Sequence, residues 1–210
     1  HVITLIVGEK VIIDLEKEVI TAFLKRKNYL IRLLVSNVDQ VLIIISCKDP
    51  AFSTNLLDKL LVISEFINIK PIICFTKYDL LEKAEEKEIN TYIKYYSNIG
   101  YKVKNNNEIN KLKDLLKEKI TVLAGQSGVG KSTLLNCLDK TLNLKTNSLS
   151  KGLKRGKHTT RHVELFNINN GLVADTPGFS CLDFIDMTKA DIRDNVIEFN
   201  KYRHKSLVLL

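Results

Sequence analysis

Apolar residues along the chain follow two spacings, one typical of buried strands and one typical of helices. Residues 41–45 are a continuous apolar run, rich in β-branched residues, as expected for a strand buried on both faces. Mostly apolar segments at residues 69–75 and 120–124 predict two more buried strands. Two more strands are expected at residues 163–168 and 171–174. Helical patterns occupy residues 56–66, 82–96, 112–119 and 132–138. Strands that alternate with helices predict an α/β fold, with a mostly parallel sheet covered on both faces.

The first 35 residues show a different pattern, in which apolar and polar side chains alternate one by one. The alternation runs through Val2, Thr4 and Ile6, and Gly8 marks an expected turn. Residues 25–29, KRKNY, add a basic run with one aromatic side chain. We interpret residues 1–35 as the remnant of a small β domain, because the segment is too short to close a whole barrel.

Length and composition predict one core of ordinary size with a small appendage. The chain has 210 residues, of which 45% are hydrophobic, so a buried core is expected rather than global disorder. No apolar run is long enough to span a bilayer, and no secretory signal is visible in the sequence shown. The cysteines, Cys47, Cys74, Cys137 and Cys181, form no CxxC pair, which favours reduced thiols in a cytoplasmic protein over a zinc site.

The formal charge is +8, from 32 Lys and Arg against 24 Asp and Glu. A basic balance favours a polyanionic partner, with RNA first and an acidic membrane surface second. The alternative is a general preference for lysine and asparagine, of which residues 105–107, NNN, are an example. Charge alone leaves both interpretations open.

Residues 125–132, GQSGVGKS, match the pattern G-x-x-x-x-G-K-[ST] of phosphate-binding loops. The glycines let the backbone curl so that several N–H groups point at one phosphate group, and the helix that follows adds its positive end. Lys131 is expected to contact the β- and γ-phosphates, and Ser132 to bind Mg²⁺. A chance glycine-rich turn is the alternative, but the expected strand before the loop and helix after it favour the phosphate-binding interpretation.

Thr76-Lys77-Tyr78-Asp79 follows the expected strand at residues 69–75 and resembles the NKxD motif of GTPases, with threonine in first position. A carboxylate at Asp79 can accept hydrogen bonds from the ring N–H and the exocyclic amine of guanine, whereas adenine offers no such pair. Lys77 would lie over the base. The alternatives are a polar loop without a base contact, or an ATPase with a similar sheet.

Asp175-Thr-Pro-Gly178 follows the expected strand at residues 171–174. At this strand end Asp175 is placed to hold Mg²⁺ through water, and the Gly178 N–H to sense the γ-phosphate. The motif alone is a common turn, and its place downstream of the phosphate-binding loop is what favours a nucleotide site. Phe179 comes next, where GTPases of the Ras type have a glutamine that orients water, so slow intrinsic hydrolysis or another catalytic group is expected.

The long loop at residues 145–162 includes the sequence GKHTTRH. A threonine hydroxyl here could complete the Mg²⁺ shell only when the γ-phosphate is present. Thr159 and Thr160 both remain candidates, and we favour Thr160. His158 is the best candidate for a catalytic group in place of the missing glutamine, and the alternative is a loop histidine that contacts phosphate or RNA.

The base-recognition motif precedes the phosphate-binding loop, the reverse of the order in ordinary GTPases. A sheet of this kind tolerates such a permutation because chain termini often lie close together on a surface. This order, with GQSGVGKST, RGKHTTRHVEL and DTPGF, resembles the circularly permuted GTPases of the RsgA family, named for small ribosomal subunit biogenesis. The segments NVDQV at residues 37–41 and TKYDLL at residues 76–81 are similar to that family too, and the resemblance covers about residues 25–200.

The resemblance implies an OB-fold domain, a permuted GTPase domain of the P-loop NTPase type and a zinc-binding domain, in a cytoplasmic enzyme. It further implies action late in 30S assembly, contact with 16S rRNA, and hydrolysis that the subunit stimulates. We accordingly divide the chain into residues 1–35 (partial OB-fold-like domain), 36–186 (permuted GTPase domain) and 187–210 (start of a C-terminal region). Zn²⁺ is expected from the family, but no zinc ligands are identifiable in this sequence, and residues 104–107 lack the Ser-Ala type loop expected beside the base.

The expected enzyme converts GTP to GDP and phosphate with Mg²⁺, as a monomer that contacts the 30S subunit and no membrane. Its expected GTP-binding residues are Thr76, Lys77, Asp79, Gly125, Gln126, Ser127, Gly128, Val129, Gly130, Lys131, Ser132, Thr133, Asp175 and Gly178. The expected Mg²⁺ ligands are Ser132, Thr160 and, through water, Asp175, and the expected catalytic residues are Lys131, Thr160 and His158. A competing hypothesis is an RNA-binding scaffold that holds GTP as a structural ligand with little turnover.

Overall fold

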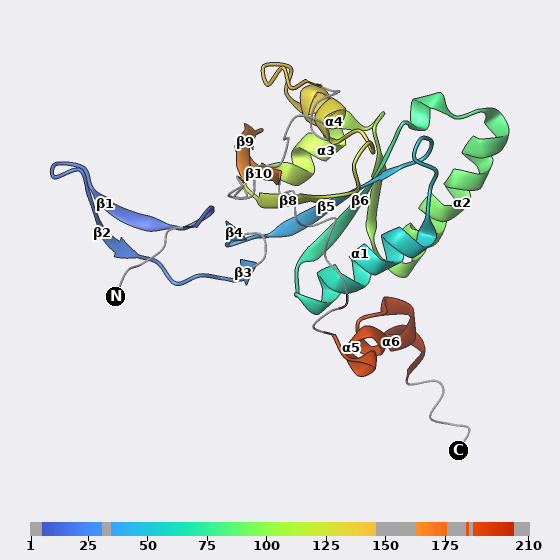
Figure 1. Ribbon diagram of the computed structural model, residues 1–210, viewed down its shortest axis with the longest axis horizontal. Helices are drawn as coiled ribbons and strands as arrows, with labels where there is room; N and C mark the ends of the chain where they lie inside the picture. Colours follow the sequence, from blue (N-terminus) through green and yellow to red (C-terminus); the bar gives the residue numbers. More distant parts are fainter. Residues whose placement is uncertain (1–5, 31–34, 146–162, 176–183, 185–186, 204–210) are drawn as a thin grey trace, which may run out of the picture.

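A computed structural model describes residues 6–30, 35–145, 163–175, 184 and 187–203 of the chain. Its centre is a six-stranded sheet with the strand order β7-β6-β5-β8-β10-β9 (Figure 1). The strands are β5 (Gln40–Ser46), β6 (Lys70–Thr76), β7 (Lys102–Asn105), β8 (Ile120–Ala124), β9 (Glu164–Ile168) and β10 (Gly171–Asp175). Neighbouring strands are parallel except for the antiparallel β9–β10 pair. The predicted α/β fold with a mostly parallel sheet is therefore confirmed.

Helices cover both faces of this sheet, and each face has its own core. The helices are α1 (Thr54–Phe66), α2 (Lys83–Ile99), α3 (Ile109–Leu116) and α4 (Lys131–Leu138). Val41, Ile43 and Ile45 of β5 pack in a cluster with α1 and α2, whereas Leu42 and Ile44 pack with α3 and α4. Successive side chains of a strand point to opposite faces, so a strand covered on both sides needs a continuous apolar run.

Helix boundaries follow from local capping more closely than from the apolar pattern. Ser53 caps α1 by accepting a hydrogen bond from the Leu56 N–H, which moves the start of the helix ahead of its first apolar residue. A capping box between Glu82 and Glu85 starts α2, and Gly100, in the left-handed conformation, ends it. Helix α3 ends at Leu116, earlier than the expected residue 119, because the backbone turns at residues 117–118 to enter β8.

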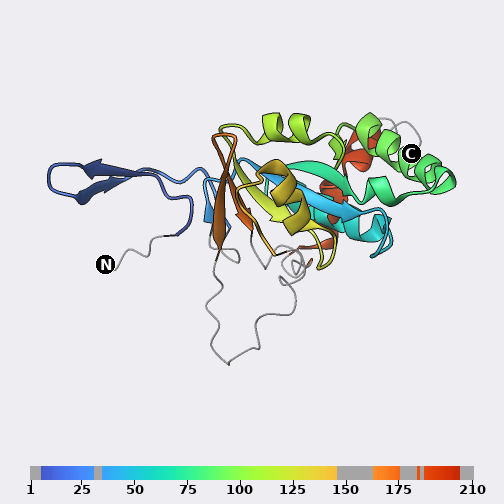
Figure 2. The ribbon, with the colours of Figure 1, turned by 90° about the horizontal axis from the view of Figure 1, so that it is seen from above.

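The amino-terminal residues form small two-stranded sheets outside the central sheet. Strand β1 (Val11–Asp14) pairs antiparallel with β2 (Val19–Phe23), and β3 (Tyr29–Leu30) pairs antiparallel with β4 (Val35–Ser36). The β1–β2 hairpin extends away from the central sheet in both views (Figures 1 and 2). At the other end of the chain, α5 (Lys189–Asp194) and α6 (Ile197–Arg203) lie beside α1 and α2, and Tyr95 Oη donates a hydrogen bond to Glu198 Oε1 at 2.7 Å.

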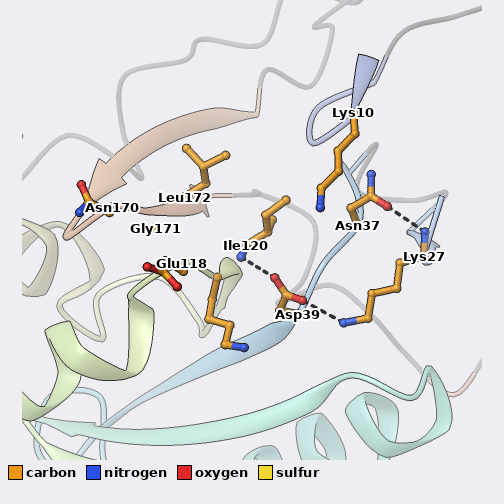
Figure 3. A pocket seen from close by; sticks show the side chains of 10 residues that line it. Lys10, Lys27, Asn37, Asp39, Glu118, Ile120, Asn170, Gly171 and Leu172 are labelled. Atoms are coloured by element: carbon orange, nitrogen blue, oxygen red, sulfur yellow. Dashed lines mark hydrogen bonds and ion pairs between the residues drawn. The ribbon is translucent and has the colours of Figure 1, made fainter. Parts of the chain in front are cut away.

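Residues 37–40 join the amino-terminal strands to the central sheet. The Asn37 side chain accepts a hydrogen bond from the Lys27 N–H and donates one to the Gly8 carbonyl, both at 2.8 Å. Asp39 accepts from the Ile120 N–H and from Lys27 Nζ, both at 2.9 Å (Figure 3). Lys27, Asn37, Asp39 and Ile120 line a groove of about 280 Å³ at the amino-terminal ends of the parallel strands. The Asp39 contact thus fixes the start of β8, the strand that leads into the phosphate-binding loop.

The Asp39 contact makes a testable contribution to stability. We expect Asp39→Asn to lower the free energy of unfolding by about 1 kcal/mol at pH 7, because a charged acceptor for the Lys27 ammonium is replaced by a neutral amide. Urea unfolding of the variant measures this difference. Asp114→Asn is the control, since Asp114 is exposed on α3, and it should change the free energy of unfolding little.

The contacts of Asp39 also determine how the stability difference between wild type and Asp39→Asn depends on pH. Burial acts to raise the pKa of Asp39, but hydrogen bonds from Ile120 and Lys27, with the positive charges of Lys27 and Lys119, hold it below its ordinary value. The stabilisation is therefore fully present above the unfolded-state pKa of about 3.9 and is lost as the pH falls through the folded-state pKa. The stability difference between wild type and Asp39→Asn should shrink from pH 7 to pH 3, and a difference that grows would contradict this assignment.

Candidate nucleotide-binding site

The carboxyl ends of three parallel strands bring the predicted site residues to one edge of the sheet. Strand β8 leads into the glycine-rich loop, β6 into the segment that holds Asp79, and β10 ends at Asp175. Ligands in open α/β sheets bind at this edge, in the crevice outside the strand ends. The sheet order therefore assembles, from three separate stretches of sequence, the groups that the motifs predicted separately.

The glycine-rich loop has a backbone that other residues would strain. Gly125, at the end of β8, has φ +148°, and a Cβ added there would lie 2.4 Å from the Ile44 carbonyl oxygen of the neighbouring strand. Gly130 has φ +91° at the N-cap of α4 and makes no side-chain cap. Gly130 has no side chain that could cap the N–H groups in the first turn of α4. An anion can therefore bind these N–H groups, and the helix dipole favours negative charge at this end of the helix.

The Lys131 side chain reaches from the start of α4 back across the loop to its first residues. Its ammonium donates hydrogen bonds to the carbonyls of Gly125, at 2.6 Å, and Gln126, at 2.9 Å. Burial lowers the pKa of Lys131, and the negative charge of Asp175 partly opposes that shift. The ammonium is therefore a half-buried cation inside the loop, where phosphate oxygens would be stronger acceptors than the two carbonyls.

Asp175 and Ser132 are the described candidates for binding Mg²⁺. Burial raises the pKa of Asp175, with the positive charge of Lys131 opposing the shift and Glu164 adding to it. The Ser132 side chain lies in the first turn of α4 and is buried. Carboxylate and hydroxyl oxygens are protein ligands that suit Mg²⁺, and a cation here would favour the charged form of the half-buried Asp175 carboxyl. These residues fit the predicted metal.

Thr76 ties the base-recognition segment to the phosphate-binding loop. Its buried hydroxyl lies 2.5 Å from the Val129 carbonyl and 3.2 Å from the Ile45 carbonyl, and it has one hydrogen to donate. A Cβ added at Gly130 would lie 3.8 Å from the Thr76 Cβ, so the glycine leaves only the space of a methyl group between the two segments. Threonine in the first position of the motif thus holds the two halves of the site at a fixed separation.

Lys77, Tyr78 and Asp79 continue the segment on the outer side of this tie. Lys77 has the left-handed backbone conformation, with φ +57°, and its ammonium donates to the Asp49 carbonyl. The 3₁₀ helix η1 (Tyr78–Leu80) follows. Asp79 Oδ1 accepts a hydrogen bond from Asn106 Nδ2 at 2.7 Å, and Asn106 Oδ1 accepts one from the Tyr78 N–H at 3.0 Å.

Asn106 is a candidate site residue that the sequence does not reveal, because it contacts Tyr78 and Asp79. Residues 104–107 contain no Ser-Ala type loop, so the family resemblance predicts no group there beside the base. The position of Asn106 directly after a strand is the feature that could have indicated it. Strand β7 ends at Asn105, so a polar side chain just after it lies at the same sheet edge as the segment after β6. An asparagine amide there can meet the carboxylate of Asp79 without the expected motif.

Several predicted site residues lie outside the described residues, namely His158, Thr159, Thr160, Gly178 and Phe179. Within the described ranges, no group of three or more His, Cys, Asp or Glu side chains is placed to hold a metal ion, so these residues offer no zinc site. Among the helices that the structure describes, none is long and apolar enough to cross a membrane.

Comparisons with known proteins agree with this geometry. The family model described as RsgA GTPase matches residues 19–185. Small ribosomal subunit biogenesis GTPase RsgA of Bacillus cytotoxicus is 48% identical over 199 residues, which cover 90% of this chain and 68% of that protein. Small ribosomal subunit biogenesis GTPase RsgA 2 of Oceanobacillus iheyensis is 49% identical over 185 residues, covering 86% and 63%.

Solved structures show the same similarity. YloQ, described as a circularly permuted GTPase, superposes with a TM-score of 0.76 at 38% identity, covering 95% of this chain and 66% of that one. YjeQ from Thermotoga maritima gives a TM-score of 0.74 at 33% identity, covering 93% and 69%. The chain thus spans between 63% and 69% of the length of these four proteins.

Proposed function

Because this chain belongs to the RsgA GTPase family, we propose that it hydrolyses GTP to GDP and phosphate as an assembly factor of the small ribosomal subunit. One observation carries the proposal beyond family membership. The Thr76 hydroxyl joins the loop that holds Lys131 to the segment that holds Asp79, so the phosphate and base sites form one unit. Such a unit can bind one guanine nucleotide at both ends.

At the phosphate end, the chain supplies donors and positive charge. Lys131 would exchange its two loop carbonyls for phosphate oxygens, and the N–H groups at the start of α4 would add hydrogen bonds to the same groups. Bound Mg²⁺ would neutralise charge on the β- and γ-phosphates, with Ser132 and, through water, Asp175 to hold it. Most of the rate enhancement would come from such positioned charges rather than from covalent chemistry.

At the base end, Asp79 is proposed to select guanine. A carboxylate accepts hydrogen bonds from the ring N–H and exocyclic amine of guanine, whereas adenine presents a bare ring nitrogen at the first of these positions. Lys77, held by the Asp49 carbonyl, would lie over the base. Binding therefore depends on the base as well as on the phosphates.

Residues outside the described part of the chain complete the proposal. Thr160, or Thr159 in its place, would bind Mg²⁺ in the GTP state, and the Gly178 N–H would contact the γ-phosphate. Phe179 cannot orient water, so His158 is proposed to do so, and slow turnover is expected without a partner. The proposed partner is the 30S subunit with its 16S rRNA, contacted in the cytoplasm by a monomer. The net charge of +8 supports a polyanionic partner.

Stimulation by the subunit tests this function. We expect phosphate release from GTP to rise about tenfold or more on addition of 30S subunits, since partners that complete a GTPase site accelerate hydrolysis strongly. The measurement is steady-state phosphate release at matched protein concentration with and without subunits. A 50S subunit is the control for nonspecific RNA effects. Tight GTP binding without stimulation would support instead the scaffold that holds GTP as a structural ligand.

A further inference from the structure

A hollow of about 440 Å³ lies between the start of α1 and the first half of α2. From α2 it is lined by Glu85, Glu88, Ile89 and Tyr92, whose spacing of three or four positions places them on one face of the helix. Phe52, just before α1, also lines it, and its ring centroid lies 4.8 Å from that of Tyr92. Two aromatic rings and two carboxylates therefore border one space, which we call the α1–α2 hollow.

The charge of the α1–α2 hollow is opposite to that of the whole chain. The chain carries a formal charge of +8, yet no lysine, arginine or histidine is among the described residues that line the hollow. Glu85 is paired, since its two oxygens accept from Lys48 Nζ at 3.0 and 2.9 Å. The exposed Glu88 side chain makes no hydrogen bond or ion pair with the residues that the structure describes. Glu88 thus gives the hollow a negative charge that no neighbouring side chain neutralises.

Glu88 and Tyr92 are four positions apart on α2, so their side chains are neighbours. A cation over an aromatic face is attracted to it, and a guanidinium can stack on a ring while its N–H groups donate to a carboxylate. The ammonium of a lysine is more strongly hydrated and has no flat face to stack. Phosphate groups of RNA would be repelled by the two carboxylates, so the chemistry favours a protein partner.

We propose that the α1–α2 hollow is a docking site for an arginine side chain of a protein partner. The guanidinium stacks against Tyr92 and pairs with Glu88, and the stem of the arginine packs against Phe52. Arginine is one of the residue types that most often dominate the binding energy of protein interfaces. This inference goes beyond the proposed GTP hydrolysis and does not depend on it.

The position of the hollow places such a partner beside the proposed nucleotide site. Residues 47 and 51–53 line the hollow, and the residues between them contact both parts of that site. The Asp49 carbonyl accepts a hydrogen bond from the Lys77 ammonium, and a Cβ added at Gly128 would lie 3.9 Å from Pro50 Cδ. A partner in the hollow is therefore separated from the base and phosphate segments by one short stretch of backbone.

Titration of the full chain with short peptides tests the docking site. The probe is acetyl-Ala-Arg-Ala-amide, and the same peptides with lysine or glutamine in the middle are its controls. We expect the arginine peptide to bind with a Kd of about 1–10 mM, as for one side chain without the rest of an interface. Backbone amide shifts in NMR spectra measure binding, and the largest should map to Glu88, Ile89 and Tyr92. The lysine peptide should bind at least about threefold more weakly, and the glutamine peptide should show no saturable shift.

Two variants separate the proposed contacts. Glu88→Gln keeps the shape and removes the charge, and Tyr92→Leu keeps an apolar side chain and removes the ring. Each should weaken the arginine peptide about two- to fivefold, the usual effect of losing one exposed ion pair or one cation–π contact. Asp114→Asn is the matched control, since it removes the same charge from an exposed position of α3, and its affinity should equal that of wild type. Thermal melting reports whether each variant is folded.

Shifts confined to the hollow, with weaker binding in Glu88→Gln and Tyr92→Leu but not in Asp114→Asn, support the proposal. It is overturned if the arginine peptide shows no saturable binding, if the lysine or glutamine peptide binds equally well, or if either hollow variant keeps wild-type affinity. Equal weakening by Asp114→Asn also overturns it, because total charge would then explain the binding. Because these titrations contain no nucleotide, their failure leaves the proposed GTP hydrolysis in place.

Discussion

Lys131→Ala is expected to slow GTP hydrolysis about 10²- to 10³-fold, the usual effect of removing one preorganised charge-stabilising group. The lysine ammonium lies inside the phosphate-binding loop, bonded to the carbonyls of Gly125 and Gln126. Without it these carbonyl dipoles would face the phosphates with no cation between them. We therefore expect GTP affinity to fall as well, by at least about tenfold. Phosphate release and nucleotide titration measure the two effects.

Lys140→Ala is the matched control for this prediction. Lys140 is exposed just after α4, so the substitution removes the same charge from the protein without touching the loop. Its hydrolysis rate should stay within about twofold of wild type, as is usual for surface substitutions. Comparable loss of hydrolysis in both variants would show that total charge, rather than the ammonium inside the loop, controls the rate.

Asp79→Asn is expected to weaken GTP about 10²- to 10³-fold, since a site built to pair with base N–H groups is left with a donor facing a donor. Two effects combine in this estimate. The variant lacks the charged acceptor for the guanine amine. The new amide must also keep its oxygen toward Asn106 Nδ2, which donates to Asp79 Oδ1 in the wild type. ATP affinity should not rise, because the change adds no group that matches adenine.

Asp114→Asn, at an exposed position of α3, is the control for this second prediction. Its GTP affinity should equal that of wild type. Competition between GTP and a fluorescent GDP analogue measures both variants under the same conditions. If Asp79→Asn retained wild-type affinity, Asp79 would not contact the base, and the assignment of the segment at residues 76–79 would have to be given up.

Most of the sheet could be predicted from the sequence because its strands are buried on both faces. Residues 41–45 form the centre of β5, and their continuous apolar run is required when alternate side chains enter two different cores. The phosphate-binding loop was equally predictable. Only glycine fits at residue 125, where a Cβ would lie 2.4 Å from the Ile44 carbonyl, so the chemistry and the packing impose the same residue type.

Contacts between segments distant in sequence could not be predicted in the same way. The contact of Asn106 with Asp79 could not be predicted because it depends on β7 lying next to β6, a pairing that no local pattern specifies. The Thr76 contact with Val129 depends likewise on the order of β6, β5 and β8. Asp39 belonged to a segment that resembled the family, yet its contacts with Ile120 and Lys27 needed the structure.

The central claim is that one site binds a single nucleotide through both its guanine base and its phosphates. Competition of GTP and ATP for the wild-type protein, in the presence of Mg²⁺, tests this most directly. We predict that GTP binds at least about 100-fold more tightly than ATP, since only guanine has the ring N–H and exocyclic amine that Asp79 is proposed to bind. Equal affinity for the two nucleotides would contradict the account, because the phosphate-binding loop would then act without base recognition.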